Sequence, residues 1–558
     1  MKSIEKMNRR ELVTWAGGGL AAAAVPTIAL PAIAARAANG AAGDGAAGAA
    51  SPQGRTTFTL VSTPGIFSVR DRGAKGDGKT LDSPAINRAI EDAAKAGGGT
   101  VYFPAGVYAC YSIRLKSNVT LHLDQGAVIL AESTPHDGMA SGGYDAAEPQ
   151  GAWEPYQDYG HNHWHNSLIW GESIHNVTIV GQGLIWGKGL SRGWDGEAAL
   201  PDSNKTGVGN KAIALKNCYN VTLKDFSILQ GGWFGLLATG VDNLTVDNLL
   251  IDTNRDGMDF DCCKNVRVSN CTVNSPWDDA ICPKSSFALG YPRVTENVTI
   301  TNCFVTGGYQ LGSVMDGTWK PHNAGVRVSR TGRIKFGTES NGGFRNITVS
   351  NCVFESCNGF ALESEDGAVC EDITVTNISM RNLATSPFFI RLGSRMRGPK
   401  DAKVGYIRRL LISNVSSSGG AELPAILSGV PGYPIEDVKI NNVYLHQKGG
   451  GPAEMAALDP PENETKYPDP PMFGALPATG FFLRHLRNLE MSNVEIATEN
   501  ADARAAFWLK GVVGADFFRV RVPKASTAFD LRDVRDFRVF GSQFIRDVSE
   551  ERVENRKI

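Results

Sequence analysis

The sequence lacks a basic excess. Its 558 residues include 56 lysines and arginines against 58 aspartates and glutamates, and the sequence pI is about 6.5. Nucleic-acid-binding domains usually show a clear excess of basic residues, so we expect no nucleic-acid partner. Aromatic residues are also few, at 8 %, whereas glycine is frequent, with 63 residues. This composition is more typical of a turn-rich β protein than of a helical one.

Apolar runs of bilayer length are absent after the N-terminus, so we expect no membrane contact once an export signal is removed. A basic segment containing Arg9–Arg10 precedes a Gly/Ala-rich stretch from Val13 to Ala34, and an A-x-A cleavage pattern follows at 35–37. This pattern resembles a Tat signal. We predict a signal peptide over residues 1–37, a flexible Ala/Gly linker over 38–56, and an exported protein, periplasmic or secreted. An uncut N-terminal membrane anchor is the alternative.

The ten cysteines contain no C-x-x-C pair, since Cys262 and Cys263 are adjacent, so thiolate ligation of zinc has little support. All ten fall between Cys110 and Cys370. Three of them end an Asn-Cys pair after a strand-like segment: Cys271, Cys303 and Cys352. We expect most cysteines to be free and stacked in a core. Disulfide bonds, which an exported protein can form, are the alternative.

A short segment recurs about every 22 residues. Asn220-Val-Thr-Leu, Asn243-Leu-Thr-Val and Asn265-Val-Arg-Val follow one another at intervals of 23 and 22, and Asn176-Val-Thr-Ile precedes them by 44. Such a period is typical of a solenoid, and β-branched runs bounded by Asn, Asp or Gly indicate strands. We therefore predict an all-β fold, a parallel β-helix, over residues 57–548.

The first coil needs a cover, and the sequence offers one helix for it. Ser83–Pro84 is a helix start and Gly97–Gly99 a stop. The residues between them form an apolar stripe: Ile86, Ala89, Ile90 and Ala93. Farther on, five long insertions between repeats mark loops that would wall a groove: His136–His165, Ser285–Glu296, Gly307–Arg333, Met396–Arg409 and Lys448–Gly480.

Three carboxylates are placed one period apart. Asp256 lies 22 residues before Asp278, which is followed by Asp279. Successive coils of a β-helix are roughly 4.8 Å apart, so we expect Asp256 beside Asp278. Converging carboxylates raise one pKa and suit acid–base chemistry on glycosidic bonds. An acidic solenoid edge and a Ca²⁺ site that includes Asp259 and Asp261 are the alternatives.

Three motifs resemble glycoside hydrolase family 28, the polygalacturonase family. Asn254-Arg-Asp-Gly-Met-Asp259 is similar to its Asn-Thr-Asp-Gly-x-Asp motif, and Trp277-Asp-Asp-Ala-Ile-Cys-Pro-Lys284 to its Gly-Asp-Asp-x-x-x-x-Lys segment. Arg333-Ile-Lys335 is identical to its Arg-Ile-Lys motif. The resemblance is strong from about Phe67 to Leu362. It implies a right-handed parallel β-helix that hydrolyses α-linked, galacturonan-type pectin with inversion and without a cofactor.

The matching positions imply roles. Asp278 would be the general acid, while Asp256 and Asp279 would hold and deprotonate the water. The resemblance also implies three substrate-binding residues: Asn254, Arg333 and Lys335. Two fixed cations suit an acidic polysaccharide or oligosaccharide, because Arg offers a bidentate fork to a carboxylate.

Two departures separate this chain from the family pattern. Gly307 stands where the family's Gly-His-Gly histidine should fall, and Arg255 replaces a threonine. We therefore expect a divergent, exo-acting or side-branch pectin hydrolase whose exact substrate is open. A Pro-rich loop over Gly450–Gly480 closing one end of the cleft would favour exo action.

Alternating histidines occur in His161-Asn-His-Trp-His165. We interpret His161 and His165 as sugar contacts; a metal site and structural hydrogen bonding are the alternatives, and no metal belongs to the resembled family. Four aromatic residues are candidates for stacking on sugar rings: Trp233, Trp277, Tyr309 and Trp319. Two other classes of protein remain open, a Ca²⁺-dependent polysaccharide lyase and a non-catalytic carbohydrate-binding β-helix. The sequence makes no prediction of oligomeric state.

Overall fold

The computed structural model describes residues 65–558 except 133–142, 158, 192–205, 324 and 525. The expected signal peptide (1–37) and linker (38–56) lie outside the described residues. None of the described helices is long and apolar enough to cross a membrane.

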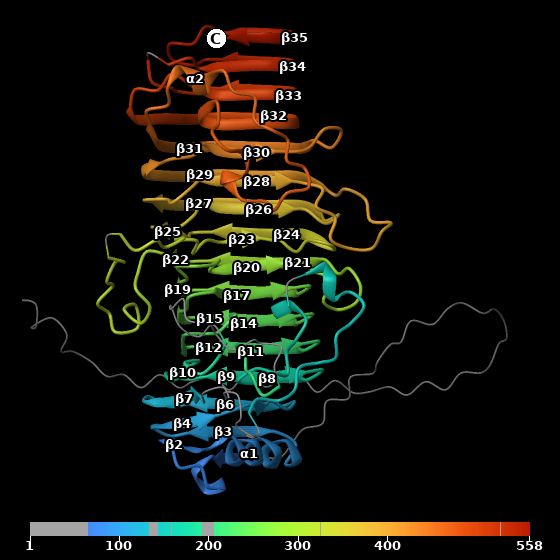
Figure 1. Ribbon diagram of the computed structural model, residues 1–558, viewed down its shortest axis with the longest axis vertical. Coiled ribbons are helices and arrows are strands. Elements are labelled where there is room, and N and C mark those ends of the chain that lie inside the picture. Colours follow the sequence, from blue (N-terminus) through green and yellow to red (C-terminus); the bar gives the residue numbers. More distant parts are fainter. Residues whose placement is uncertain (1–64, 133–142, 158, 192–205, 324, 525) are drawn as a thin grey trace, which may run out of the picture. The chain divides into compact units, whose positions relative to one another are not determined.

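Parallel strands build the described part of the chain, and each coil hydrogen-bonds to the next (Figure 1). One column of strands runs β1 (Gly65–Ser68), β3 (Gly99–Phe103), β6 (Val119–Leu123), β9 (His175–Val180), β12 (Tyr219–Lys224), β15 (Asp242–Asp247), β18 (Lys264–Ser269), β21 (Thr295–Thr301), β24 (Gly343–Ser350), β27 (Val369–Arg381), β29 (Tyr406–Ala421), β31 (Ile435–Gly449), β32 (Ala478–Asn500), β33 (Ala505–Phe518) and β34 (Phe529–Phe540). A second runs β2 (Asp77–Leu81), β4 (Gly106–Cys110), β7 (Ala127–Ala131), β10 (Leu184–Trp186), β13 (Ser227–Leu229), β16 (Leu250–Asp252), β19 (Thr272–Asn274), β22 (Phe304–Thr306) and β25 (Val353–Glu355).

The third column, named here the catalytic sheet, carries the predicted site residues. It begins with β5 (Ile113–Arg114), β8 (Ile169–Glu172), β11 (Lys211–Lys216), β14 (Phe234–Thr239), β17 (Asp256–Asp261) and β20 (Ile281–Lys284). It continues, through a bridge from Ile281 to Ile334, with β23 (Lys335–Phe336), β26 (Phe360–Ser364), β28 (Phe388–Leu392) and β30 (Ala425–Ser428). These columns confirm the prediction of an all-β, right-handed parallel β-helix.

The recurring asparagines form a ladder at one turn of each coil. Asn220, Asn243 and Asn265 have φ values of 56°, 54° and 58°, in the left-handed region that asparagine tolerates better than most residues. Each side-chain amide donates to the amide oxygen of the preceding coil: Asn220 to Asn176 at 3.0 Å, Asn243 to Asn220 at 3.1 Å and Asn265 to Asn243 at 3.2 Å. The sequence repeat is therefore the signature of this turn.

Inside the coils the core is apolar, and eight of the ten cysteines belong to it. All ten are buried and free, as the sequence predicts for most of them. The thiols of Cys271, Cys303 and Cys352 lie on successive coils and donate to carbonyl oxygens two residues earlier, at 3.2, 3.3 and 3.2 Å. They act as small buried side chains.

The first coils are covered by α1 (Ser83–Lys95), whose Ile86, Ala89, Ile90 and Ala93 are buried. The helix begins at Ser83, so its cap residue is Asp82 and not Ser83. The Asp82 carboxylate instead accepts hydrogen bonds from the N–H groups of Lys75 and Gly76. At the other end, β35 (Val548–Lys557) pairs antiparallel with β34.

Candidate active site

Asp256 begins β17 and faces outward because of the glycine that follows it. Met258 and Phe260 pack in the interior core, and Gly257 faces inward as well, since a Cβ there would lie 2.5 Å from the Ala280 carbonyl oxygen and 2.6 Å from a Val273 methyl. Two consecutive inward positions break the alternation of the strand. Asp256 is thereby turned to the outer face of the catalytic sheet.

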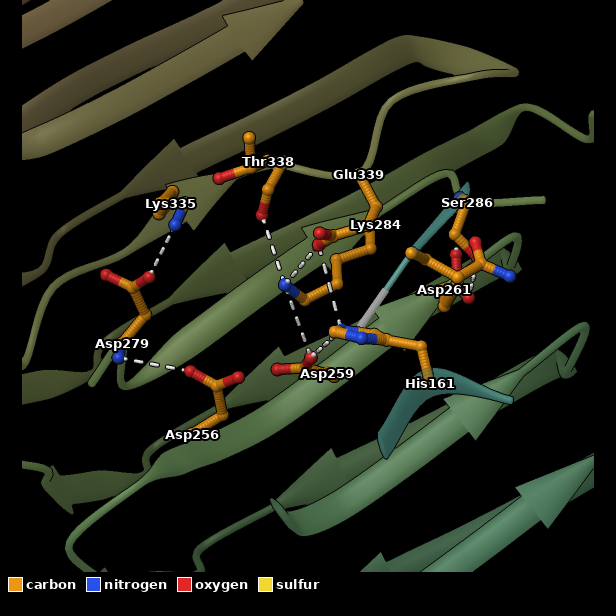
Figure 2. Close-up of polar contacts among 12 residues, drawn as sticks. His161, Asp256, Asp259, Asp261, Asp279, Lys284, Ser286, Lys335, Thr338 and Glu339 are labelled. Atoms are coloured by element: carbon orange, nitrogen blue, oxygen red, sulfur yellow. Dashed lines mark hydrogen bonds and ion pairs between the residues drawn. The ribbon is translucent and has the colours of Figure 1, made fainter. Parts of the chain in front are cut away.

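Asp278 and Asp279 lie in the turn before β20. The pairing of Met258 with Ile281 gives this coil an interval of 23 residues. The interval of 22 predicted from the sequence is therefore wrong on the catalytic sheet. With an interval of 23, the residue one coil after Asp256 is Asp279 and not Asp278. The Asp279 N–H donates to one oxygen of Asp256 at 3.2 Å (Figure 2). It also donates to one oxygen of Asp278 at 3.0 Å. The carboxylates of Asp256 and Asp278 thus meet at the backbone N–H of Asp279, and the three acidic residues come together as expected.

Asp279 forms what we call the buried side of the site. Its two oxygens accept from Arg333 Nε and Lys335 Nζ, both at 2.8 Å, and all three side chains are at most 5 % exposed. Burial alone would raise the pKa of Asp279, but the charges of Lys335 and Arg333 lower it well below its usual value. The carboxylate is therefore ionised at any working pH. Losing one partner of such a buried pair typically costs about 3–5 kcal/mol, so Asp279 holds both cations firmly.

Asp256 has the opposite electrostatic state. It is buried, and burial together with the carboxylates of Asp278, Asp259 and Asp279 raises its pKa well above the usual value. Asp256 and Asp279 have carboxylate oxygens within 4.8 Å of each other. This separation allows one water molecule to hydrogen-bond to both. The pair consequently combines a carboxyl group whose pKa is raised with one whose pKa is lowered.

Asp278 forms the open side of the site. Its second oxygen lies 2.9 Å from Arg255 Nη1, and the two side chains are 23 % and 27 % exposed. The Arg255 guanidinium carbon lies 4.9 Å from the centre of the Trp233 ring. Part-exposed ion pairs contribute only about 0–1 kcal/mol, because water screens the charges. Arg255 is the residue that replaces the family's threonine, so the open side is particular to this chain.

Beside the three carboxylates, Asp259 joins a buried ionic network (Figure 2). Its Oδ2 lies 3.6 Å from His161 Nε2 and 3.7 Å from Lys284 Nζ, and Lys284 also contacts Glu339 at 3.0 Å. Burial raises the pKa of Asp259. Burial would also raise the pKa of Glu339, but the charges of Lys284 and His161 lower it well below its usual value. Lys284 ends one of the family motifs, but its partner Glu339 has no signal in the sequence.

The structure brings His161 to this network and places His165 elsewhere. His165 Nε2 lies 2.8 Å from Glu172 on β8, and its ring stacks on Trp170. Because β8 is three strands from β17, the two sites are about 14 Å apart at ~4.8 Å per strand.

Among the described residues, two groups of side chains have the donor atoms of a metal site. The first comprises Glu148, His165 and Glu172, where Lys216 Nζ already lies 3.1 Å from Glu172. The second comprises Asp256, Asp279 and Cys282, where both Asp279 oxygens already face cations.

Of the remaining predicted residues, Asn254 borders the carboxylates, whereas Tyr309 lies in the loop after β22. The Asn254 carbonyl accepts from the Trp277 N–H at 3.1 Å and so joins the two turns that carry the aspartates. Tyr309 packs edge-on against Trp319 at 5.1 Å, and its carbonyl accepts from Asn274 at 3.0 Å.

Gly307 lies where the backbone of another loop segment passes. A Cβ at this position would lie 2.8 and 2.9 Å from backbone carbons of Arg330. No side chain fits there without a shift of the backbone. The absence of the family histidine therefore follows from the course of the loop between Gly307 and Arg333.

The N-terminal end of the outer face of the catalytic sheet is covered. Trp164 packs against Ala214, Phe234 and Leu237, which point away from the interior core. Lys211 Nζ holds this segment by donating to the carbonyl of residue 163 at 2.5 Å. Burial lowers the pKa of Lys211 to about 7. We call the covering segment, residues 144–166, the N-terminal plug.

The C-terminal end is covered by the loop between β31 and β32, residues 450–477, named here the C-terminal plug. Its Phe473 and Leu476 pack on Phe389, Ile426, Phe482 and Trp508 of the outer face. Buried arginines anchor its backbone: Arg391 donates to the carbonyl of residue 462 at 3.0 Å, and Arg484 to that of residue 460 at 2.8 Å. Tyr467 of this plug has its ring centre 6.0 Å from Lys335 Nζ. The carboxylates therefore lie between two covered ends.

Comparisons with known proteins agree with this architecture. Residues 66–274 match the family model described as rhamnogalacturonase A/epimerase, pectate lyase-like. The chain is 23 % identical over 408 residues to a probable polygalacturonase of Vitis vinifera, covering 68 % of this chain and 74 % of that protein. It is 24 % identical over 385 residues to an exo-poly-alpha-D-galacturonosidase of Dickeya chrysanthemi, covering 60 % of this chain and 58 % of that protein's length. The solved structure of a family 28 exopolygalacturonase from Yersinia enterocolitica has the same fold, with a TM-score of 0.57, 20 % identity, and coverage of 81 % and 78 %.

Proposed function

The chain is a divergent relative of the polygalacturonases of glycoside hydrolase family 28 and is a glycoside hydrolase, and from this premise we propose its reaction. It hydrolyses α-glycosidic bonds in a uronate-containing pectic polysaccharide or oligosaccharide, with inversion, from one end of the substrate. The observation that carries the proposal is the meeting of the Asp256 and Asp278 carboxylates at the backbone N–H of Asp279.

Each carboxyl group has one role in this proposal. Asp278, the most exposed of the three, donates a proton to the leaving oxygen. Asp256 and Asp279 hold the attacking water between them, and the ionised Asp279 accepts its proton. The separation of their oxygens, within 4.8 Å, supports this role. Inversion follows when the water attacks from the face opposite the leaving group.

The substrate-binding residues fall into two groups. Asn254, Arg333, Lys335 and His161 border the carboxylates, and the proposal places them around the sugar whose bond is cleaved. Because Arg333 and Lys335 both hold Asp279, they act on a substrate carboxylate only through donors that Asp279 does not use. Tyr309 would contact a sugar at the rim, and His165 only a distant unit of the substrate.

Exo action is supported by the two plugs. Each packs apolar side chains on one end of the outer face of the catalytic sheet, which would hinder a long polysaccharide from lying along the sheet through the site. A substrate end can enter between them. This closure at both ends goes beyond the single closed end that the sequence suggested.

The test uses oligogalacturonates of defined length, together with rhamnogalacturonan and xylogalacturonan. We expect release of monomers only, and a proton NMR spectrum that shows the β anomer first. Mixed oligomers would contradict exo action, and the α anomer would contradict inversion. A product absorbing as an unsaturated uronate, lost with a chelator, would identify a lyase, and the absence of any product would favour a binding protein.

We also propose that the protein is exported with removal of residues 1–37. Mass spectrometry of the mature N-terminus after expression with its leader tests this. A mature chain that begins near residue 38 supports export, and retention of Met1 contradicts it.

A further inference from the structure

We propose that Arg255 recognises the charge of the substrate: a uronate carboxylate replaces Asp278 as the partner of Arg255, and Asp278 is thereby released for its proposed role as the general acid. This inference rests on the proposed function, because it gives Asp278 the role of general acid. It makes Arg255 a positioning and specificity-determining residue that the resembled family pattern does not contain.

The geometry distinguishes Arg255 from the other cations of the site. Among the described residues, three cations contact the proposed catalytic carboxylates: Arg255, Arg333 and Lys335. Arg333 and Lys335 are buried with Asp279, and either would leave a buried charge behind on changing partner. Arg255 and Asp278 are both about one quarter exposed, so water stabilises each of them when the pair opens. Arg255 is therefore the cation that can exchange its partner at low cost.

The proposed role of Asp278 requires such an exchange. Arg255 at 2.9 Å occupies one oxygen of Asp278, whereas a general acid must contact the leaving oxygen of the substrate. A substrate carboxylate offers Arg255 the same planar pair of oxygens that Asp278 offers.

After the exchange Asp278 keeps the backbone N–H of Asp279 as a hydrogen-bond partner. Its side chain is 23 % exposed, so water and substrate can reach it. A neutral sugar or a methyl ester provides no carboxylate for Arg255, which then remains on Asp278.

Trp233 gives Arg255 a fixed support during this exchange. The guanidinium carbon lies 4.9 Å from the ring centre, within the range of a cation–π contact. The ring can hold the guanidinium at the rim of the site while its hydrogen-bonding edge turns from Asp278 to the substrate.

The experiment compares Arg255→Thr and Arg255→Lys with the wild-type protein on oligogalacturonates with free and with methyl-esterified carboxylates. We expect the preference for the free acid, measured as the ratio of kcat/KM values, to fall about 10- to 100-fold in Arg255→Thr, the range for a hydrogen bond between charged groups. KM for the free acid should carry most of this change, and Arg255→Lys should restore part of it. Arg519→Thr, which removes an exposed arginine near the end of β33, is the matched control and should leave the ratio unchanged.

The change in KM rather than kcat, with partial rescue by Arg255→Lys, is a readout that a purely structural role would not move. An unchanged ratio of kcat/KM values would overturn the inference and leave the proposed hydrolase intact.

A binding experiment separates the inference from the proposed function. If the wild-type protein cleaves no uronate, the proposed function fails. Calorimetric titration with trigalacturonate and with its methyl ester then tests whether Arg255 still recognises the carboxylate. Weaker binding of the free acid alone in Arg255→Thr would support charge recognition by Arg255. Equal binding in both proteins would overturn it.

Discussion

On the buried side of the active site, Asp279 accepts hydrogen bonds from Arg333 and Lys335, and all three side chains are nearly inaccessible to water. On the open side, its neighbour Asp278 pairs with Arg255, and water reaches both. The two carboxylates are adjacent in the sequence and differ only in what surrounds them. A carboxylate between buried cations keeps its charge and its partners, whereas one with a part-exposed partner can exchange that partner. Burial of the partners, more than their charge, thus separates the two roles.

Replacing Asp279 should have the largest effect. Asp279→Asn leaves Arg333 and Lys335 buried without their counter-charge, so the free energy of unfolding should fall by about 3–5 kcal/mol. Hydrolysis should be lost as well, because the proposed base is gone. Urea unfolding and product release measure the two effects; a fully stable Asp279→Asn would show that the buried side does not depend on this charge.

Asp278→Asn sharpens the comparison on the open side. Its kcat should fall by about 10²–10⁴-fold, the usual contribution of general acid catalysis. The free energy of unfolding should change by no more than about 1 kcal/mol, because only a part-exposed ion pair is lost. Activity assays and urea unfolding on the same preparation check both. A large loss of stability would indicate that Asp278 is structurally required.

The dependence of stability on pH should change when Asp279 is replaced. The pKa of Asp279 is lowered in the folded protein, so its stabilising contribution is present above its usual pKa of about 3.9 and is lost as the pH falls below that value. Asp279→Asn should therefore lose stability less steeply than wild type on acidification from about pH 4. Unfolding midpoints in urea across this range provide the measurement, and equal slopes for the two proteins would contradict the assignment.

The smallest effect is expected for the stability of Arg255→Thr. Removal of one part-exposed ion pair should change the free energy of unfolding by less than about 1 kcal/mol. Arg333→Met, which leaves the buried Asp279 with one cation fewer, should cost several times more. Thermal or urea unfolding of the two variants side by side tests this ranking, which fails if Arg255→Thr is the less stable of the pair.

The sequence predicted the coil architecture well because the turn that defines each coil requires a residue tolerant of positive φ. Asn220, Asn243 and Asn265 supply it, and their spacing gives the period. The carboxylates were also predictable as a group. The register of the carboxylates could not be predicted, because one additional residue before β20 makes Asp279, and not Asp278, the residue one coil after Asp256.

Contacts made by loops could not be predicted. His161 reaches Asp259, 98 positions later in the chain, through a segment without a repeat. Likewise, Arg391 and Arg484 hold the backbone of the C-terminal plug, and backbone acceptors carry no signal in side-chain patterns. Family motifs located Arg333 and Lys335, but only the structure shows that Asp279 holds both.

One measurement tests most directly the claim that the two aspartates have different roles. Aryl α-galacturonides with a good leaving group do not need protonation of that group, so Asp278→Asn should keep most of the wild-type kcat/KM on them while losing it on digalacturonate. Asp279→Asn should be inactive on both substrates, because the water still needs a base. An equal loss by Asp278→Asn on both substrates would contradict its assignment as the general acid.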